Sequence, residues 1–316
     1  MEENPRKPRR RWFQYSLRTL LIFTAIIAIA LGWWSYKARQ QREAVAAIEA
    51  VDGYLGGRVN YDFEERNLKG PPCWPWWLVD AIGVDYFANV HAVYLEQSDI
   101  TDARLERLEG LTRLQVLKLY DTGITDNGLD HLKNLAALKE IHLGQTRITD
   151  AGLRHLRGMT ALQVLDLTSP GIVNIKITDA GLMHLKGLTK LQELCLFHTA
   201  VTDAGLEHLE GLTRLQKLDL CGTNISDAGL NHLKGLTALQ LLRLERTRIS
   251  DLGLKHLQGL TALEELNLER TDVSDSGLEH FRGLTRLKDL NLEETNVTDA
   301  GVARLQKSLP NCKIEH

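Results

Sequence analysis

The sequence has few cysteines and no short catalytic motif. Only four of its 316 residues are cysteine, too few for a disulfide scaffold in a chain of this length. It contains no nucleophile elbow, no phosphate-binding glycine-rich loop and no HExxH pair, the patterns that would indicate a hydrolase, a nucleotide enzyme or a zinc protease. The sequence therefore gives no indication of catalysis, and we predict a protein that is not an enzyme and has no cofactor.

Basic residues are scarce beyond the first 42 positions. That segment holds nine Lys or Arg and two acidic residues, which leaves 29 basic and 39 acidic residues in the rest of the chain. The overall net charge of −3 therefore hides an acidic body. Because nucleic-acid binding needs a basic surface, we predict no nucleic-acid partner.

The sequence has a single long hydrophobic run, LRTLLIFTAIIAIALGWW, at residues 17–34. Extended to Tyr36, it would span about 30 Å as a helix, the thickness of a bilayer core. Aromatic residues stand on both sides of it, as in membrane interfaces: Trp12, Tyr15, Trp33, Trp34 and Tyr36. We predict a basic cytoplasmic tail (1–16) and a transmembrane signal anchor (17–36), with the rest of the chain outside the cytoplasm because positive charge favours the inner side.

A cleaved signal peptide is the alternative for this run. Ala28, Ile29 and Ala30 have the small-x-small form of a signal-peptidase site, and cleavage after Ala30 would also export the chain. Residues 37–89 are predicted to form a helix, with Val45, Ile48 and Val51 on one face, followed by an irregular N-terminal cap. In this cap we expect a strand in RVNYDF (58–63) and a tryptophan-rich helix over 74–82.

The rest of the chain is a repeat with a period of 24 residues. ISDAGLNHLKGLTALQLLRLERTR at 225–248 returns as ISDLGLKHLQGLTALEELNLERTD. The spacing is 24 throughout except once, when it is 29. Repeats start at Ile100, Ile124, Ile148, Ile177, Val201, Ile225, Ile249, Val273 and Val297. A unit this short cannot bury its own apolar face, so the copies must stack on one another.

Each repeat can be read from its side-chain pattern. Leu218 and Leu220 alternate with polar residues, which predicts a short strand with one face in the core. Ser226 and Asp227 stand where a helix needs side-chain oxygens for its first N–H groups. Gly235 is predicted to end that helix in the left-handed conformation, with Asn134 as its substitute in one copy.

The segment LQKLDLCGTNI (215–225) resembles the leucine-rich repeat signature, in which L-x-x-L-x-L is followed by a polar and an aliphatic residue. The usual Asn is Thr here, so the resemblance implies a threonine ladder: Thr122, Thr146, Thr199, Thr223, Thr247, Thr271 and Thr295. It implies an α/β leucine-rich repeat solenoid over residues 90–316, with a concave parallel sheet and short convex helices, as in bacterial exported repeat proteins. Cys312 occupies a leucine slot and is predicted to be buried.

The concave face is where the repeats differ, so we predict that it binds a protein or peptide partner. Two columns of side chains lie on it. Aromatic residues would anchor the partner near the N-terminal half, and charged residues would select it near the C-terminal half. The candidate contact residues are Tyr94, Lys118, Tyr120, His142, Asp166, Phe197, Asp219, Arg243, Glu245, Asn267 and Glu269.

Two other functions remain open. The column His142, Asp166, Cys195 and Asp219 could hold a transition metal or an enzymatic site, although its spacing matches no metal motif. The repeats also resemble those of F-box ubiquitin-ligase adaptors, which would place the chain inside the cell, but the sequence has no F-box-like segment.

Other recurring residues have a simpler interpretation. Seven histidines share one helix slot, where a pH sensor or metal row is possible but a structural role is favoured: His131, His155, His184, His208, His232, His256 and His280. An Asp follows Thr or Ser in each of nine copies, from Asp102 to Asp299, and we interpret it as a helix cap and not a calcium ligand. The 29-residue copy carries an insertion at 170–176, which is either neutral or part of the binding edge.

Overall fold

The computed structural model describes residues 17–51, 57–62, 84–86, 88–169 and 177–316. The predicted basic tail, the tryptophan-rich helix over 74–82 and the insertion at 170–176 lie outside these residues.

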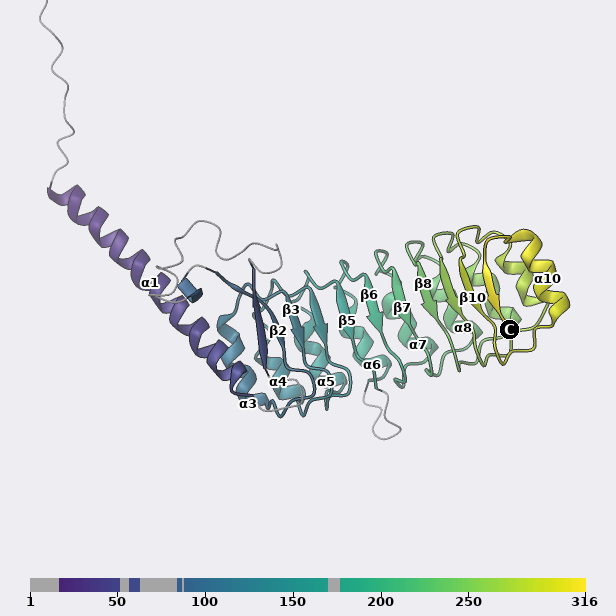
Figure 1. The fold of residues 1–316 in the computed structure, drawn as a ribbon, viewed down its shortest axis with the longest axis horizontal. Coiled ribbons are helices and arrows are strands. Elements are labelled where there is room, and N and C mark those ends of the chain that lie inside the picture. Colours follow the sequence, from purple (N-terminus) through teal and green to yellow (C-terminus); the bar gives the residue numbers. More distant parts are fainter. Residues whose placement is uncertain (1–16, 52–56, 63–83, 87, 170–176) are drawn as a thin grey trace, which may run out of the picture.

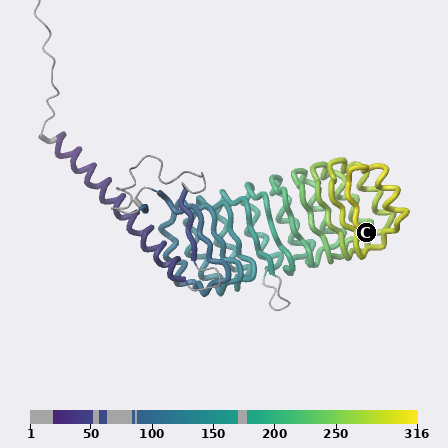
Figure 2. The backbone as a smooth tube through the Cα atoms, in the orientation of Figure 1, coloured from purple at the N-terminus to yellow at the C-terminus, as the bar shows by residue number. Residues whose placement is uncertain are grey.

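Eleven described strands form one sheet in chain order, each beside its neighbour in sequence. The first pair is antiparallel, and the pairs that follow are parallel, as the repeat predicts. Figure 1 shows the strands along one side of an elongated solenoid, and the trace in Figure 2 shows its turns stacked side by side. The strands are β1 (Arg58–Tyr61), β2 (Val90–Tyr94), β3 (Val116–Lys118), β4 (Glu140–His142), β5 (Val164–Asp166), β6 (Glu193–Cys195), β7 (Lys217–Asp219), β8 (Leu241–Arg243), β9 (Glu265–Asn267), β10 (Asp289–Asn291) and β11 (Lys313–Glu315).

Short helices cover the convex side. In most repeats one turn of α-helix continues directly into a 3₁₀ turn, the tighter form commonly used in short pieces. The α-helices are α3 (Asp102–Leu105), α4 (Asp126–Asp130), α5 (Asp150–Leu153), α6 (Asp179–Leu182), α7 (Asp203–Leu206), α8 (Asp227–Leu230), α9 (Asp251–Leu254) and α10 (Asp299–Ser308). The 3₁₀ turns are η1 (Val84–Tyr86), η2 (Glu106–Gly110), η3 (Arg154–Leu156), η4 (Met183–Leu185), η5 (Glu207–Leu209), η6 (Asn231–Leu233), η7 (Lys255–Leu257) and η8 (Gly277–Phe281).

Between strands and helices lies one continuous apolar core, which runs from Ala44 to Cys312. Within a repeat, strand leucines such as Leu218 and helix leucines such as Leu230 are completely buried. Cys312 is buried as predicted, directly before β11, and burial raises the pKa of its thiol to about 11. Each repeat buries its apolar face only against its neighbours, so the stability of the array is shared along its length.

The threonine column differs from the ladder that the sequence suggested. Each hydroxyl donates a hydrogen bond to the carbonyl three residues earlier in its own repeat, as Thr223 Oγ1 does to the Leu220 oxygen at 2.6 Å. Thr199 and Thr247 make the same contact at 2.8 and 2.6 Å. Because each of these hydroxyls donates to a carbonyl of its own repeat, the column closes each turn locally and does not tie repeats together.

The aspartate column links neighbouring repeats through side-chain hydrogen bonds. We predicted that each Asp caps its own helix; in the structure the preceding Ser or Thr is the cap residue, as where Ser226 Oγ accepts the Ala228 N–H at 3.4 Å. The carboxylate instead accepts two hydrogen bonds from the next copy. Asp203, for example, binds the Ser226 backbone N–H at 2.7 Å and its hydroxyl at 2.5 Å.

Gly235 follows the end of the helical segment as predicted, directly after the cap residue Lys234, but the predicted left-handed conformation was wrong, because its backbone does not adopt a positive φ. Among described residues, positive φ occurs in the turn after most of the concave strands, at Gly222 (66°) and at non-glycine residues such as Gln97 (53°) and Arg246 (55°). Glycine is needed at a different slot. A Cβ built on Gly229 would lie 2.3 Å from Asp203 Oδ1, whereas one on Gly235 would meet no atom within 4 Å.

The helix α1 (Leu17–Glu49) is continuous. The predicted boundary between the membrane segment (17–36) and the helix that follows it therefore lies inside a single helix. The helix α1 includes the one described segment, Thr19–Glu49, that is long and apolar enough to cross a membrane, and the apolar part of it is not buried in the chain. Figure 1 shows this first half projecting away from the solenoid, while the second half lies along its N-terminal end. There Val45, Ile48 and Val51 enter the core, as their spacing predicted.

Candidate binding surface

The hydrogen-bonded pairing of the parallel strands places the residues of one predicted column, here called the central column, side by side. Each of its residues is the direct partner of the next across the parallel strands. The column runs Tyr94, Lys118, His142, Asp166, Cys195, Asp219, Arg243, Asn267 and Asn291. The second column, two residues later in each repeat, contains Tyr120, Phe197, Glu245 and Glu269. The two columns therefore line one face.

A third column on this face was missed by the sequence analysis. Side chains two residues before the central column share its face, and register aligns Ala92, Val116, Glu140, Val164, Glu193, Lys217, Leu241, Glu265, Asp289 and Lys313. It contributes ion pairs across neighbouring strands, such as Lys217 Nζ to Glu193 Oε1 at 2.7 Å. The alternation of inward and outward side chains along each strand would have predicted this column from the sequence.

At the N-terminal end the face is basic and aromatic. The Arg58 guanidinium on β1 lies 4.6 Å from the ring centroid of Tyr94, and Lys118 Nζ lies 6.0 Å from it. Lys118 also pairs with Glu140 at 3.4 Å. Cations over an aromatic face are attracted by its quadrupole, so Tyr94 is held between two positive charges.

His142 is held between two carboxylates. Its Nε2 lies 2.8 Å from Glu140 Oε1 and its Nδ1 3.3 Å from Asp166 Oδ2. Burial alone would lower the pKa of His142, but the hydrogen bonds to Asp166 and Glu140 outweigh it and raise the pKa. Both ring nitrogens therefore already have acidic partners.

The predicted aromatic anchors Tyr120 and Phe197 are half-buried. The Tyr120 hydroxyl accepts a hydrogen bond from Gln145 Nε2 at 2.6 Å, and burial, followed by the charge of Asp121, raises the pKa of Tyr120. The Phe197 ring lies 4.4 Å from that of His198. These rings leave part of their surface open to a partner.

Several polar residues of the central column support the turns that follow the strands. Asp166, Asp219, Asn267 and Asn291 each accept the backbone N–H two residues ahead, at 2.8 to 3.0 Å. Such Asx turns stabilise the chain reversal. Arg243 adds a pair with Asp219 at 3.4 Å. Part of the predicted contact set therefore also stabilises the repeat.

Glu245 is an unexpectedly buried carboxylate on this face. Its side chain is nearly covered, at 9% exposure, and its Oε2 has no hydrogen-bond partner. Burial, with the charges of Asp219 and Glu269, raises its pKa to about 7 against the opposing charge of Arg243. The neighbouring Cys221 thiol has its pKa raised to about 12 by burial and by Glu245.

The C-terminal part of the face is a charged groove of about 220 Å³, lined by residues that include Arg243, Asn267, Asn291, Lys313 and Glu315. Beside it, Arg270 binds Glu294 and lies 3.7 Å from Glu269. These charges are mostly exposed, where ion pairs contribute little stability. They remain available for contacts.

A search of curated proteins found no match. Among solved structures, internalin C2 of Listeria monocytogenes is 26% identical with a TM-score of 0.50, covering 69% of this chain and 85% of that one. A leucine-rich repeat protein of Leptospira interrogans is 21% identical with a TM-score of 0.53 over 67% of this chain, which spans 51% of that protein. The leucine-rich repeat family model matches residues 213–273. The chain is a leucine-rich repeat protein.

Leucine-rich repeat folds are scaffolds for protein binding, and the metal alternative finds little support in this one. No group of three or more metal-ligating side chains exists among the residues that the structure describes. Cys195, the softest ligand of the suggested column, lies 3.0 Å from Thr168 Oγ1, and burial, with Asp219, raises its pKa to about 11. In this structure the Cys195 side chain is therefore a neutral thiol already in contact with Thr168.

Four of the seven convex histidines of this leucine-rich repeat protein contact the preceding repeat, whereas the Nδ1 atoms of His184 and His208 are buried without a hydrogen-bond partner. His131 and His232 contact Glu109 and Glu210 at 2.7 Å, and His155 contacts Asp130 at 3.1 Å. Neighbouring copies therefore use these side chains as contacts between coils, as the structural interpretation expected.

Proposed function

We propose that this leucine-rich repeat protein is a membrane-anchored, non-enzymatic scaffold whose concave face binds a protein or peptide partner outside the cytoplasm. One observation carries the binding part of the proposal. The core and the aspartate contacts between repeats use nearly the same residue types in each copy, whereas the three concave columns change from repeat to repeat. Structure alone requires no such variation on an exposed face, so we assign it to recognition.

The face is divided in a way that fits one extended partner. Tyr94, Tyr120 and Phe197 supply aromatic area, and aromatic residues dominate binding energy at interfaces. From Arg243 onward the columns are mainly charged or polar, which favours selection of a partner by electrostatic complementarity. The candidate contact residues keep this role here, with Glu140 and Arg58 added to them.

The anchoring part rests on α1. Its apolar first half makes no buried contacts with the chain, and a free apolar helix of this length fits a bilayer. With the basic residues before it, this helix would place the repeats on the outer side.

The test is protease accessibility in intact cells of the native host, with the membrane fraction probed for the full chain. We expect the repeats to be cut from outside and to remain in the membrane fraction until cut. A resident cytoplasmic protein in the same cells serves as the control for leakage. Repeats that are protected until lysis would contradict the proposed orientation and favour the intracellular adaptor.

A further inference from the structure

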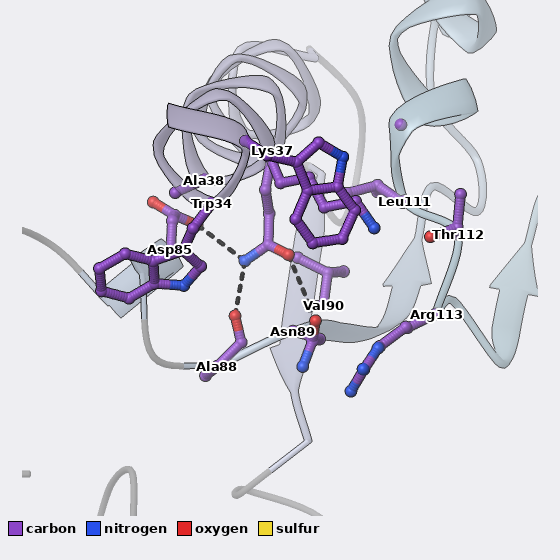
Figure 3. Close-up of a pocket in the computed structure, with 13 residues that line it drawn as sticks. Trp34, Lys37, Ala38, Asp85, Ala88, Asn89, Val90, Leu111, Thr112 and Arg113 are labelled. Atoms are coloured by element: carbon purple, nitrogen blue, oxygen red, sulfur yellow. Dashed lines mark hydrogen bonds between the residues drawn. The ribbon is translucent and has the colours of Figure 1, made fainter. Parts of the chain in front are cut away.

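A cavity of about 250 Å³ lies where α1 meets the first repeat. Trp33, Trp34 and Lys37 line it from α1, and Thr112 and Arg113 line it from the segment after η2. Figure 3 shows Trp34 and Arg113 on opposite sides of it. The apolar core reaches this cavity through Val90 and Leu111, but neither the core nor the concave face accounts for the tryptophans and cations in its lining.

The charge inside this cavity is positive. Its acidic residue, Asp85, is already bound by Arg42 at 3.6 Å, by Gln41 Nε2 at 3.1 Å and by the Tyr61 hydroxyl at 3.1 Å. Lys37 and Arg113, by contrast, are both exposed, and neither forms an ion pair within the described part of the chain. Two cations without acidic partners therefore share one cavity.

The position of the cavity along α1 also sets its level relative to a bilayer that contains the apolar half of the helix. Lys37 lies one helical turn beyond Trp33, with its Nζ 4.2 Å from the indole centroid. One turn advances about 5.4 Å, and the headgroup layer beyond the hydrocarbon core is on the order of 5 to 8 Å thick. If the tryptophans mark the edge of the hydrocarbon, Lys37 reaches the level of the lipid phosphates.

We propose that this cavity binds the headgroup of an anionic phospholipid, with its phosphate between Lys37 and Arg113 and its acyl chains beside Trp33 and Trp34. A zwitterionic lipid would bring an ammonium group, and Asp85, the carboxylate that could receive it, is already paired. The inference rests on the proposed membrane anchor. It adds a second attachment, which holds the first repeat against the bilayer.

The test uses the full chain in nanodiscs that contain equal amounts of phosphatidylglycerol and phosphatidylcholine, released and examined by native mass spectrometry. We expect retained lipid to be mainly phosphatidylglycerol. A basic residue near a membrane surface contributes about a fivefold gain in affinity, so Lys37→Gln with Arg113→Gln should reduce retention by roughly 25-fold. Arg39→Gln is the matched control, because Arg39 is an exposed cation on the same helix but does not line the cavity.

Three results would overturn the lipid site: no preference between the lipids, an equal loss with Arg39→Gln, or displacement of the lipid by inorganic phosphate, which would indicate a site for free anions. Chain that enters nanodiscs but retains no lipid contradicts this inference alone. Chain that does not enter nanodiscs contradicts the anchor, and the lipid site with it.

Discussion

The carboxylate of Asp251 receives both polar hydrogens of Ser274 in the next repeat, the backbone N–H at 2.7 Å and the hydroxyl at 2.6 Å. Ser276 adds a third hydrogen bond at 2.7 Å. Hydrogen bonds to a charged group are among the strongest in proteins. This arrangement recurs along the solenoid, so the aspartate column is the recurring side-chain link between coils, in addition to the backbone hydrogen bonds of the sheet.

We predict that Asp251→Ala lowers the free energy of unfolding around its repeat by about 2 to 4 kcal/mol, because it leaves the Ser274 N–H without its partner. Amide hydrogen exchange of peptides over residues 270–280 would measure this locally. Asp299→Ala is the matched control, because Asp299 has the same slot but is fully exposed and contacts only the His316 side chain among described residues. Equal effects of the two variants would contradict the role assigned to the column.

The pH dependence of this effect follows from the pKa of Asp251. Burial would raise that pKa, but the hydrogen bonds from Ser274 and Ser276 outweigh it and lower the pKa. A carboxylate with a lowered folded pKa stabilises the protein above its unfolded pKa of about 3.9, and the contribution is lost as the pH falls through the folded value. The difference between wild type and Asp251→Ala should therefore be full at pH 7 and shrink well below pH 4.

Two glycines from one repeat should respond in opposite ways to alanine. Gly229→Ala would place a Cβ 2.3 Å from Asp203 Oδ1, and the forced shift should cost about 1 to 3 kcal/mol. Gly235 has open space and no positive φ, so Gly235→Ala should be neutral or stabilise by about 0.4 to 1 kcal/mol. Urea unfolding of the two variants, followed by circular dichroism, compares them directly. A large loss with Gly235→Ala would mean that the helix end needs glycine after all.

Glu245 should make the protein less stable as the pH rises. Its folded pKa is raised to about 7 by burial and the nearby acids, so the neutral form is favoured in the folded state and stability is lost as the pH rises through that value. Glu245→Gln should therefore raise the free energy of unfolding by on the order of 2 kcal/mol at pH 8.5 and have little effect at pH 4.

Urea unfolding at these two pH values tests the prediction. Glu293→Gln is the control, because Glu293 is exposed in the same column, and we expect a change under about 0.5 kcal/mol at both pH values. A gain that is the same at pH 4 would show that the substitution acts through packing and not through charge.

The aromatic anchors can be tested together. Tyr120→Ala with Phe197→Ala should weaken partner binding by about 2 kcal/mol or more, since buried aromatics dominate interface energy, while the circular dichroism spectrum stays unchanged. Met183→Ala with Leu252→Ala removes exposed apolar area from the helix-covered side and should leave binding intact. The measurement is the affinity for a partner cross-linked in the host envelope; an unchanged affinity in the Tyr120 and Phe197 variant would move the site elsewhere.

The sequence predicted the fold well because each repeat records the same local pattern many times over. The strand positions, the buried leucines and the central column all follow from alternation within one unit. The roles of the aspartates and threonines did not, because hydrogen-bond partners depend on the spacing between coils. The sequence shows that an aspartate recurs at the position of Asp203. It does not show that Ser226 is its partner, because the two residues become neighbours only when two coils stack.

The candidate site was predicted only in outline for the same reason. Register follows from the repeat, so the alignment of Lys118 with His142 could be foreseen. The contact between Arg58 and Tyr94 could not, because β1 precedes the repeats and pairs antiparallel with β2. The burial of Glu245 likewise depends on the bulk of side chains in adjacent coils, which no pattern within one repeat specifies.

The unbroken course of α1 has a mechanical consequence. Bending a helix at its middle requires breaking backbone hydrogen bonds, and α1 shows no interruption between its projecting half and the half packed on the solenoid. When the projecting half is held in place, the concave face therefore points in a fixed direction, because the rigid helix connects the two. A force on a bound partner would be transmitted through the helix as a torque at the point of attachment, whereas a flexible linker would absorb it.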